Sequence, residues 1–289
     1  MEARKNTVSN YLSLVKFSHT IFALPFAIIG YFLAITYTSA KFDITLFALV
    51  VLCMVFARSA AMGFNRFIDR KIDEQNARTA VREIPAGIVK PQSAFIFVLI
   101  NCLLFIVTTY FINLLCFYLS PVALAVVLGY SLTKRFTALC HLVLGLGLSL
   151  APIGAYLAVT GKFDWLPLFF SFAVLFWVSG FDIIYALQDE EFDRSKNLKS
   201  IPVLLGKKGA LQLSTLLHVM SAVFIIYAGF YAKFNVWYWI GTCFYSALLC
   251  YQHLLVKPND LSKVNIAFFT TNGIASVVFA AFVLIDLYF

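Results

Sequence analysis

One apolar stretch, from Trp165 to Ala186, decides the fold class, and it reads WLPLFFSFAVLFWVSGFDIIYA. Its only charged side chain is Asp182. A helix of roughly 20 mainly apolar residues is long enough to cross the hydrocarbon core of a bilayer. The stretch therefore predicts a membrane-spanning helix.

Similar apolar stretches recur along the whole chain. The 289 residues are 62% hydrophobic and only 12% charged. The further stretches lie at about 18–38, 44–63, 94–112, 114–132, 139–159, 210–231, 234–255 and 265–286. The stretch at 18–38 lacks a small-residue cleavage site, so it is expected to be a true span rather than a signal peptide. The sequence predicts an all-α integral membrane protein with nine transmembrane helices and one domain, residues 1–289.

The basic residues alternate in density from one connection to the next. The formal net charge is +8, but the Lys and Arg residues gather before the first span and after the second, fourth, sixth and eighth. The opposite side receives only Lys41, Lys162 and Lys233. The positive-inside rule then predicts a cytoplasmic N-terminus and an external C-terminus. This placement explains the charge without a nucleic-acid partner and indicates a bacterial-type inner membrane.

Two acidic ladders lie on the predicted cytoplasmic side. The first consists of Asn65, Asp69 and Asp73, and the second of Asp182, Asp189 and Asp193. A four-residue spacing keeps helical side chains on one face. Carboxylates clustered at a membrane repel one another and resist leaving water, so a cation is expected among them. Mg²⁺ suits such oxygen ligands and commonly bridges carboxylates to substrate phosphates. The alternative is a solvated helix end in which each carboxylate pairs with a neighbouring basic residue.

The ladders begin the two long polar connections, roughly 64–93 and 187–209. Each connection continues through basic residues to a proline-containing turn. This weak internal repeat predicts two helical halves that face each other across a central cavity, with one ladder from each half. Because functional residues concentrate on long loops held by a rigid scaffold, we expect the active site there.

Two charged side chains lie within predicted spans. Asp182 is flanked by Phe181 and Ile183, and a carboxylate in such surroundings could accept a proton, orient a hydroxyl group or bond to a helix neighbour. Arg58 lies in the second span, where an unpaired cation is costly, so it is expected to snorkel or to meet an anion. The six cysteines and four histidines show no metal-ligand spacing.

Three motifs in order resemble the UbiA superfamily of intramembrane aromatic prenyltransferases. The first runs from Asn65 through Asp73 to Arg78-Thr79 and Arg82-x-x-Pro85-x-Gly87. The second runs from Asp182 through Tyr185-Ala186 to Asp193 and Lys199-Ser200. Between them, Tyr130-x-x-x-Lys134-Arg135-x-Thr137 resembles the basic loop of the family. The form of the second motif is closest to the 4-hydroxybenzoate polyprenyltransferases.

The resemblance implies a helical bundle around a cavity that opens to lipid. It implies Mg²⁺-dependent transfer of a polyprenyl group from its diphosphate to an aromatic ring in quinone biosynthesis. Carried onto this chain, it assigns Asn65, Asp69, Asp189 and Asp193 to the Mg²⁺–diphosphate, with Asp73 in support. It assigns Arg66, Arg70 and Lys134 to phosphate oxygens, and Asp182 to the phenol. Arg58 is the candidate for an acceptor carboxylate.

One departure leaves the acceptor open. Where a Pro-Ile-Gly-type segment is expected in the first span, the chain has Lys16-Phe17-Ser18-His19-Thr20. That segment resembles a divergent branch whose acceptor is a dihydroxynaphthoate of a menaquinone route. The alternatives are therefore a 4-hydroxybenzoate enzyme, a dihydroxynaphthoate enzyme and, in a different class, an ion-coupled secondary transporter. The sequence does not predict prenyl length or oligomeric state.

Overall fold

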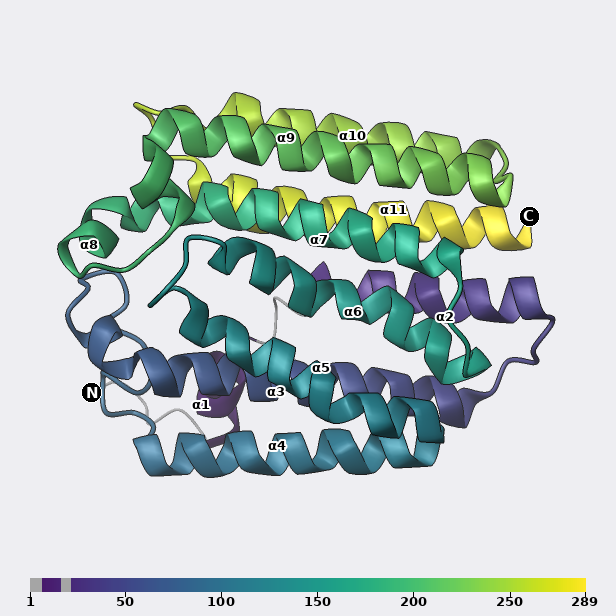
Figure 1. Ribbon diagram of the computed structural model, residues 1–289, viewed down its shortest axis with the longest axis horizontal. Coiled ribbons are helices and arrows are strands. Elements are labelled where there is room, and N and C mark those ends of the chain that lie inside the picture. The colour runs from purple at the N-terminus through teal and green to yellow at the C-terminus, as the bar shows by residue number, and fades with distance from the viewer. Residues whose placement is uncertain (1–6, 17–21) are drawn as a thin grey trace.

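The computed structural model describes residues 7–16 and 22–289, and they form a bundle of helices (Figure 1). Within these ranges the only β-type pairing is an isolated bridge between Lys257 and Asp260. The elements are α1 (Thr7–Leu14), α2 (Leu24–Thr38), α3 (Ile44–Glu74), α4 (Pro91–Ile112), α5 (Leu114–Thr133), α6 (Cys140–Thr160), α7 (Trp165–Ala186), η2 (Leu187–Asp189), α8 (Glu190–Ser195), α9 (Ile201–Ala232), α10 (Val236–Leu255), η3 (Ile266–Thr271) and α11 (Asn272–Tyr288).

Each predicted span overlaps one long helix, the last being η3 continued by α11. By length and composition, 7 of these helices could cross a membrane, which confirms an integral membrane protein. The two others are α2, with only 15 residues, and α10, whose apolar run is interrupted by Thr242, Gln252 and His253. The count of nine spans therefore stays a prediction.

The long helices run side by side and alternate in direction. The connections after α3, α5, α7 and α10 meet at the end of the bundle where α8 lies, and the C-terminus lies at the opposite end (Figure 1). These are the connections that the charge pattern assigned to one side. All the ladder residues therefore belong to a single end of the molecule.

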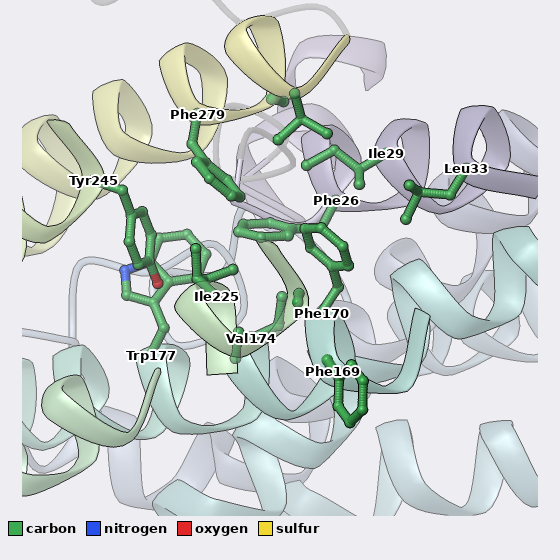
Figure 2. Close-up of a cluster of buried hydrophobic side chains, with 14 of the residues drawn as sticks. Phe26, Ile29, Leu33, Phe169, Phe170, Val174, Trp177, Ile225, Tyr245 and Phe279 are labelled. Carbon is green, nitrogen blue, oxygen red and sulfur yellow. The ribbon is translucent and has the colours of Figure 1, made fainter. Parts of the chain in front are cut away.

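An aromatic core joins α2, α7, α9, α10 and α11. Phe26, Trp177 and Phe279 are fully buried at its centre (Figure 2). The Trp177 indole Nε1 donates to Asn272 Oδ1 at 2.8 Å, and Gln252 Nε2 donates to the same oxygen at 2.7 Å. Buried polar groups must be paired, and aromatic side chains supply large packed areas, so this core rigidly joins the helices.

Both polar connections are shorter than predicted. The helix α3 continues to Glu74, so its connection to α4 spans 75–90 rather than 64–93. The apolar residues end near residue 63, but α3 itself continues, because a helix can pass from apolar to polar side chains without a change in its backbone. The helix α9 begins at Ile201 and is kinked at Gly206, whose φ of 68° suits glycine. The predicted start at residue 210 corresponds to the part after that kink.

Candidate active site

A cavity of about 450 Å³ lies where both acidic ladders meet. Its walls come from α3, the connection after α3, the ends of α5 and α6 at that side of the bundle, α7, α8 and η3. The candidate residues that line it are Arg58, Asn65, Arg66, Asp69, Asp73, Lys134, Asp182, Asp189 and Asp193. Apart from Arg70, every site residue predicted from the sequence lies on this one cavity.

The first ladder lies on one uninterrupted helix, α3, as its spacing predicted. Asn65 Nδ2 donates to Asp69 Oδ2 at 3.1 Å. Asp69 Oδ1 is paired with Arg135 Nη2 at 2.7 Å, and Asp73 Oδ1 with Arg82 Nη1 at 2.7 Å. Two of the three ladder side chains therefore already bind a cation from outside α3.

The second ladder is not carried by one helix. The chain leaves α7 at Ala186 and passes through the short 3-10 turn η2, which carries Asp189, into α8, which carries Asp193. The prediction of one continuous helical face was wrong, because the seven-residue interval from Asp182 to Asp189 crosses this break. All three side chains nevertheless line the cavity.

The second ladder is also paired with cations. Arg78 donates to Asp189 through Nε at 3.0 Å and through Nη2 at 2.5 Å, a bidentate pair. Lys134 Nζ lies 2.7 Å from Asp193 Oδ1. Burial lowers the pKa of the Arg78 guanidinium, but its bonds to Asp189 outweigh that effect and hold the pKa above its ordinary value. Arg78 therefore stays charged.

These pairs tie the two halves of the cavity together. Arg78, from the connection after α3, reaches Asp189 on the opposite half. The neighbours Lys134 and Arg135 divide between the ladders, since Lys134 pairs with Asp193 and Arg135 with Asp69. In the described residues no group of three or more His, Cys, Asp and Glu is close enough to hold a metal ion as it stands. Instead, Asp69, Asp73, Asp189 and Asp193 are each paired with an Arg or Lys side chain.

Two further guanidinium groups, those of Arg58 and Arg66, lie on the cavity. Arg66 is only 6% exposed, and Nε of both Arg58 and Arg66 is buried without a hydrogen-bond acceptor among the described residues. Because both Nε atoms are buried, these charges lie in low-dielectric surroundings. An unpaired buried cation is costly and attracts an anion.

Asp182 is bound by a residue that the sequence analysis set aside. Asp182 Oδ2 lies 2.7 Å from Nδ1 of His141, the second residue of α6. A helix neighbour was one of the alternatives for its partner, but the observed partner is 41 positions earlier in the chain. Arg78, Arg82 and Arg135 belong to the quoted motifs, but their pairing with the ladders was not predicted.

Arg70 lies apart from the other candidate residues. It does not line the cavity, because its guanidinium turns back along α3. Its Nη1 donates to the carbonyl of Phe67 at 2.6 Å, and its Cζ lies 4.4 Å from the centroid of the Phe67 ring. This position does not fit the predicted phosphate contact.

Of the segment that suggested a divergent acceptor, Lys16 lines the cavity, and Phe17, Ser18, His19 and Thr20 lie outside the described residues.

Comparisons with known proteins agree with this geometry. Residues 23–274 match the family described as the UbiA prenyltransferase family. A 4-hydroxybenzoate octaprenyltransferase of Aliivibrio fischeri (strain MJ11) is 33% identical over 241 residues, 80% of this chain and 80% of the relative.

Two solved structures share the fold. The apo structure of a UbiA homologue from Aeropyrum pernix K1 superposes with a TM-score of 0.84 at 30% identity, covering 93% of this chain and 98% of the other. A UbiA homologue from Archaeoglobus fulgidus bound to DMAPP and Mg²⁺ superposes with a TM-score of 0.73 at 20% identity, covering 96% and 99%. At that identity the second likeness shows the fold alone.

Proposed function

The chain belongs to the UbiA prenyltransferase family, and from this premise we propose that it transfers a polyprenyl group from a polyprenyl diphosphate to the ring of a hydroxy-aromatic carboxylic acid. The reaction depends on Mg²⁺ and serves ubiquinone or menaquinone biosynthesis. The acceptor is 4-hydroxybenzoate or, alternatively, a dihydroxynaphthoate. Relatives named 4-hydroxybenzoate octaprenyltransferase support the first acceptor.

One observation carries this proposal: both acidic ladders and four of the surrounding cations line a single cavity at one end of a membrane-embedded bundle. A diphosphate brings several negative charges and needs cations to bind it. The cations that line the cavity and pair with the ladders are Arg78, Arg82, Lys134 and Arg135. A site that combines carboxylates with Arg and Lys side chains suits a diphosphate that arrives with divalent metal.

The donor set fits Mg²⁺. Carboxylate and amide oxygens are the ligands that this ion prefers, and Asp73 Oδ2 is a buried oxygen without a hydrogen-bond donor in the described part of the chain. Asn65, Asp69, Asp73, Asp189 and Asp193 would hold the ion. When bound, it would neutralise negative charge on the diphosphate leaving group.

The basic side chains would bind the remaining phosphate oxygens. Lys134 and Arg135 stand between the two ladders, so they can contact a diphosphate held by both. Arg66 adds a guanidinium group whose buried Nε has no acceptor among the described residues. Cations fixed before the reaction stabilise charge that develops on a leaving group without further reorganisation.

The acceptor would bind deeper in the cavity, toward the membrane. Arg58 offers an unpaired guanidinium for the acceptor carboxylate, and Asp182 offers a carboxylate for its hydroxyl hydrogen. A hydrogen bond from the hydroxyl group to Asp182 makes the ring more electron-rich. Cleavage of the donor C–O bond gives an allylic cation and free diphosphate, and the ring carbon ortho to that hydroxyl group attacks the cation. The same ring carbon then gives its proton to the released diphosphate, which restores aromaticity.

An aromatic wall separates this region from water. Phe22, Phe181, Tyr185 and Phe268 line the cavity. The ring centroids of Tyr185 and Phe268 are 4.2 Å apart, and those of Phe22 and Phe181 are 5.5 Å apart. The faces of aromatic rings attract cations, so this wall favours an allylic cation over its capture by water.

The membrane topology belongs to the same proposal. We infer one domain, residues 1–289, with nine spans in a bacterial inner membrane, the cavity end on the cytoplasmic side and the C-terminus outside. The connections at the cavity end carry most of the basic residues, which supports this orientation. Membership in a prenyltransferase family favours the enzyme over the ion-coupled transporter.

The test is turnover by purified protein in detergent with Mg²⁺ and a long-chain polyprenyl diphosphate, offered either acceptor. Products are identified by mass spectrometry, and released diphosphate is measured in parallel. Prenylated 4-hydroxybenzoate supports the first acceptor, and a prenylated naphthoate alone supports the menaquinone route. Absence of diphosphate release with both acceptors, alongside an active relative as positive control, contradicts the proposed reaction.

A further inference from the structure

His141 is almost completely buried and pairs with the partly buried Asp182 at the wall of the cavity. The side chain of His141 is 4% exposed and that of Asp182 is 23% exposed. The pair joins α6 to α7, with Nδ1 of the imidazole 2.7 Å from Oδ2 of the carboxylate. Neither the family match nor the proposed reaction gives this histidine a role.

The second ring nitrogen of His141 has a partner that can only donate. The backbone N–H of Ile201 donates to Nε2 at 3.3 Å. Ile201 is the first residue of α9, and N–H groups in a first helical turn have no acceptor inside their own helix. Because Nε2 accepts, the proton of a neutral imidazole must be on Nδ1, which therefore donates to Asp182.

The amide that selects this tautomer is itself held in place. The Ser200 hydroxyl caps α9 by accepting from the Val203 N–H at 3.4 Å. The Lys199 N–H donates to the carbonyl of Lys134 at 2.8 Å, and Lys199 Nζ donates to the carbonyl of Phe136 at 3.1 Å. The start of α9 is thus tied to the connection between α5 and α6, just ahead of His141.

We propose that His141 is a positioning residue, which donates from Nδ1 to Asp182 and holds this carboxylate with its second oxygen free to accept the hydroxyl hydrogen of the aromatic acceptor. The proposal rests on the function assigned to Asp182 above. The terminal torsion of an aspartate is broad, so a lone carboxylate would sample many orientations. A donor fixed at one oxygen selects one of them. Partners that orient a functional side chain in this way typically change activity by about 10–100-fold when removed.

Two substitutions separate the two ring nitrogens. The amide nitrogen of Asn in His141→Asn reaches the position of Nδ1, so it can still donate to Asp182. The longer side chain of His141→Gln reaches the position of Nε2, so it can accept from Ile201 but leaves Asp182 without its donor. Both variants are similar in polarity and lose one of the two hydrogen bonds each, so each controls for loss of packing in the other.

The expected result is a difference in kcat for the acceptor reaction. His141→Gln lowers kcat by roughly 10–100-fold with the donor KM unchanged, and His141→Asn retains most of the parent kcat. In an Asp182→Asn background, His141→Gln has little further effect. Equal losses in the two variants, or a parent-like kcat in His141→Gln, would overturn the positioning role.

A second measurement does not depend on turnover. In protein with ¹⁵N-labelled histidine, NMR distinguishes an imidazole protonated at Nδ1 from one protonated at Nε2, and the His141→Asn variant identifies the His141 signal. We expect the Nδ1–H tautomer, with its Nδ1 signal shifted by Asp182→Asn. An Nε2–H tautomer overturns the inference even if the enzyme is active. A parent protein that is inactive with both acceptors would refute the proposed reaction, while the NMR result would still decide the hydrogen bond.

Discussion

Asp189→Asn is expected to separate function from stability. The substitution keeps the size of the side chain and removes its charge. Asp189 now accepts from both Nε and Nη2 of Arg78 and from Asn76 Nδ2 at 3.2 Å. The asparagine carbonyl oxygen can retain the two bonds that Oδ1 accepts, from Arg78 Nε and Asn76 Nδ2, but the bond from Arg78 Nη2 is lost. The asparagine cannot balance the Arg78 charge or serve as an anionic ligand for a metal ion.

The stability loss follows from the exposure of the pair. The side chains of Arg78 and Asp189 are 32% and 12% exposed. Breaking a fully buried ion pair costs about 3–5 kcal/mol and an exposed pair contributes about 0–1 kcal/mol, so we expect about 1–3 kcal/mol here. Turnover should fall far more, by roughly 10²–10³-fold, because a preorganised charge at the leaving group is lost.

Asp286→Asn is the matched control. Asp286 is also buried, 6% exposed, and accepts from the backbone N–H groups of Asn235 at 2.8 Å and Tyr238 at 3.0 Å. It belongs to the last turn of α11, which ends at Tyr288, and the C-terminus lies at the end of the bundle opposite α8 (Figure 1). Thermal unfolding and diphosphate release are measured for both variants in the same detergent. Asp286→Asn should lose stability and keep turnover; near-normal turnover in Asp189→Asn would refute the reasoning.

Three further predictions concern other parts of the molecule. Lys134→Met should raise the donor KM by about tenfold or more, because a charge-assisted contact contributes about 1.5–3 kcal/mol. Arg70→Met should leave the donor KM unchanged. A reversal of these two effects in steady-state kinetics would contradict the cavity assignment. Arg58→Met should raise the acceptor KM while the donor KM stays constant, and an effect on the donor alone would move Arg58 to the diphosphate. Asn272→Ala should lower the free energy of unfolding by about 1–3 kcal/mol, because Trp177 and Gln252 both lose their buried acceptor. An unchanged melting temperature would show that these donors find other partners.

The helices were predictable because lipid imposes a simple requirement on sequence. A spanning segment must satisfy its backbone internally and present apolar side chains, so hydropathy alone located the segment from Trp165 to Ala186 and its neighbours. The first ladder was predictable for a similar reason, since Asn65, Asp69 and Asp73 lie on one regular helix. The placement of Asp189 and Asp193 outside α7 was not, because no proline or glycine marks the turn that follows Ala186.

The contacts of the site were harder to predict than its members. The motif residues Arg78 and Arg135 were recognised as part of a pattern, but which carboxylate each one pairs with depends on how the helices pack. His141 carries no local signal, because its partner Asp182 is distant in sequence and its tautomer depends on the amide of Ile201. Arg70 was assigned by resemblance, and a local contact with Phe67 takes it away from the cavity.

The central claim is that both ladders hold one metal-bound diphosphate. The most direct measurement is calorimetric binding of an unreactive polyprenyl thiolodiphosphate, with and without Mg²⁺, to the parent protein and to Asp69→Asn, Asp189→Asn and Asp286→Asn. We expect Mg²⁺-dependent binding that is lost in both ladder variants and kept in Asp286→Asn. Undiminished binding to either ladder variant would contradict a site shared by α3 and the segment that follows α7.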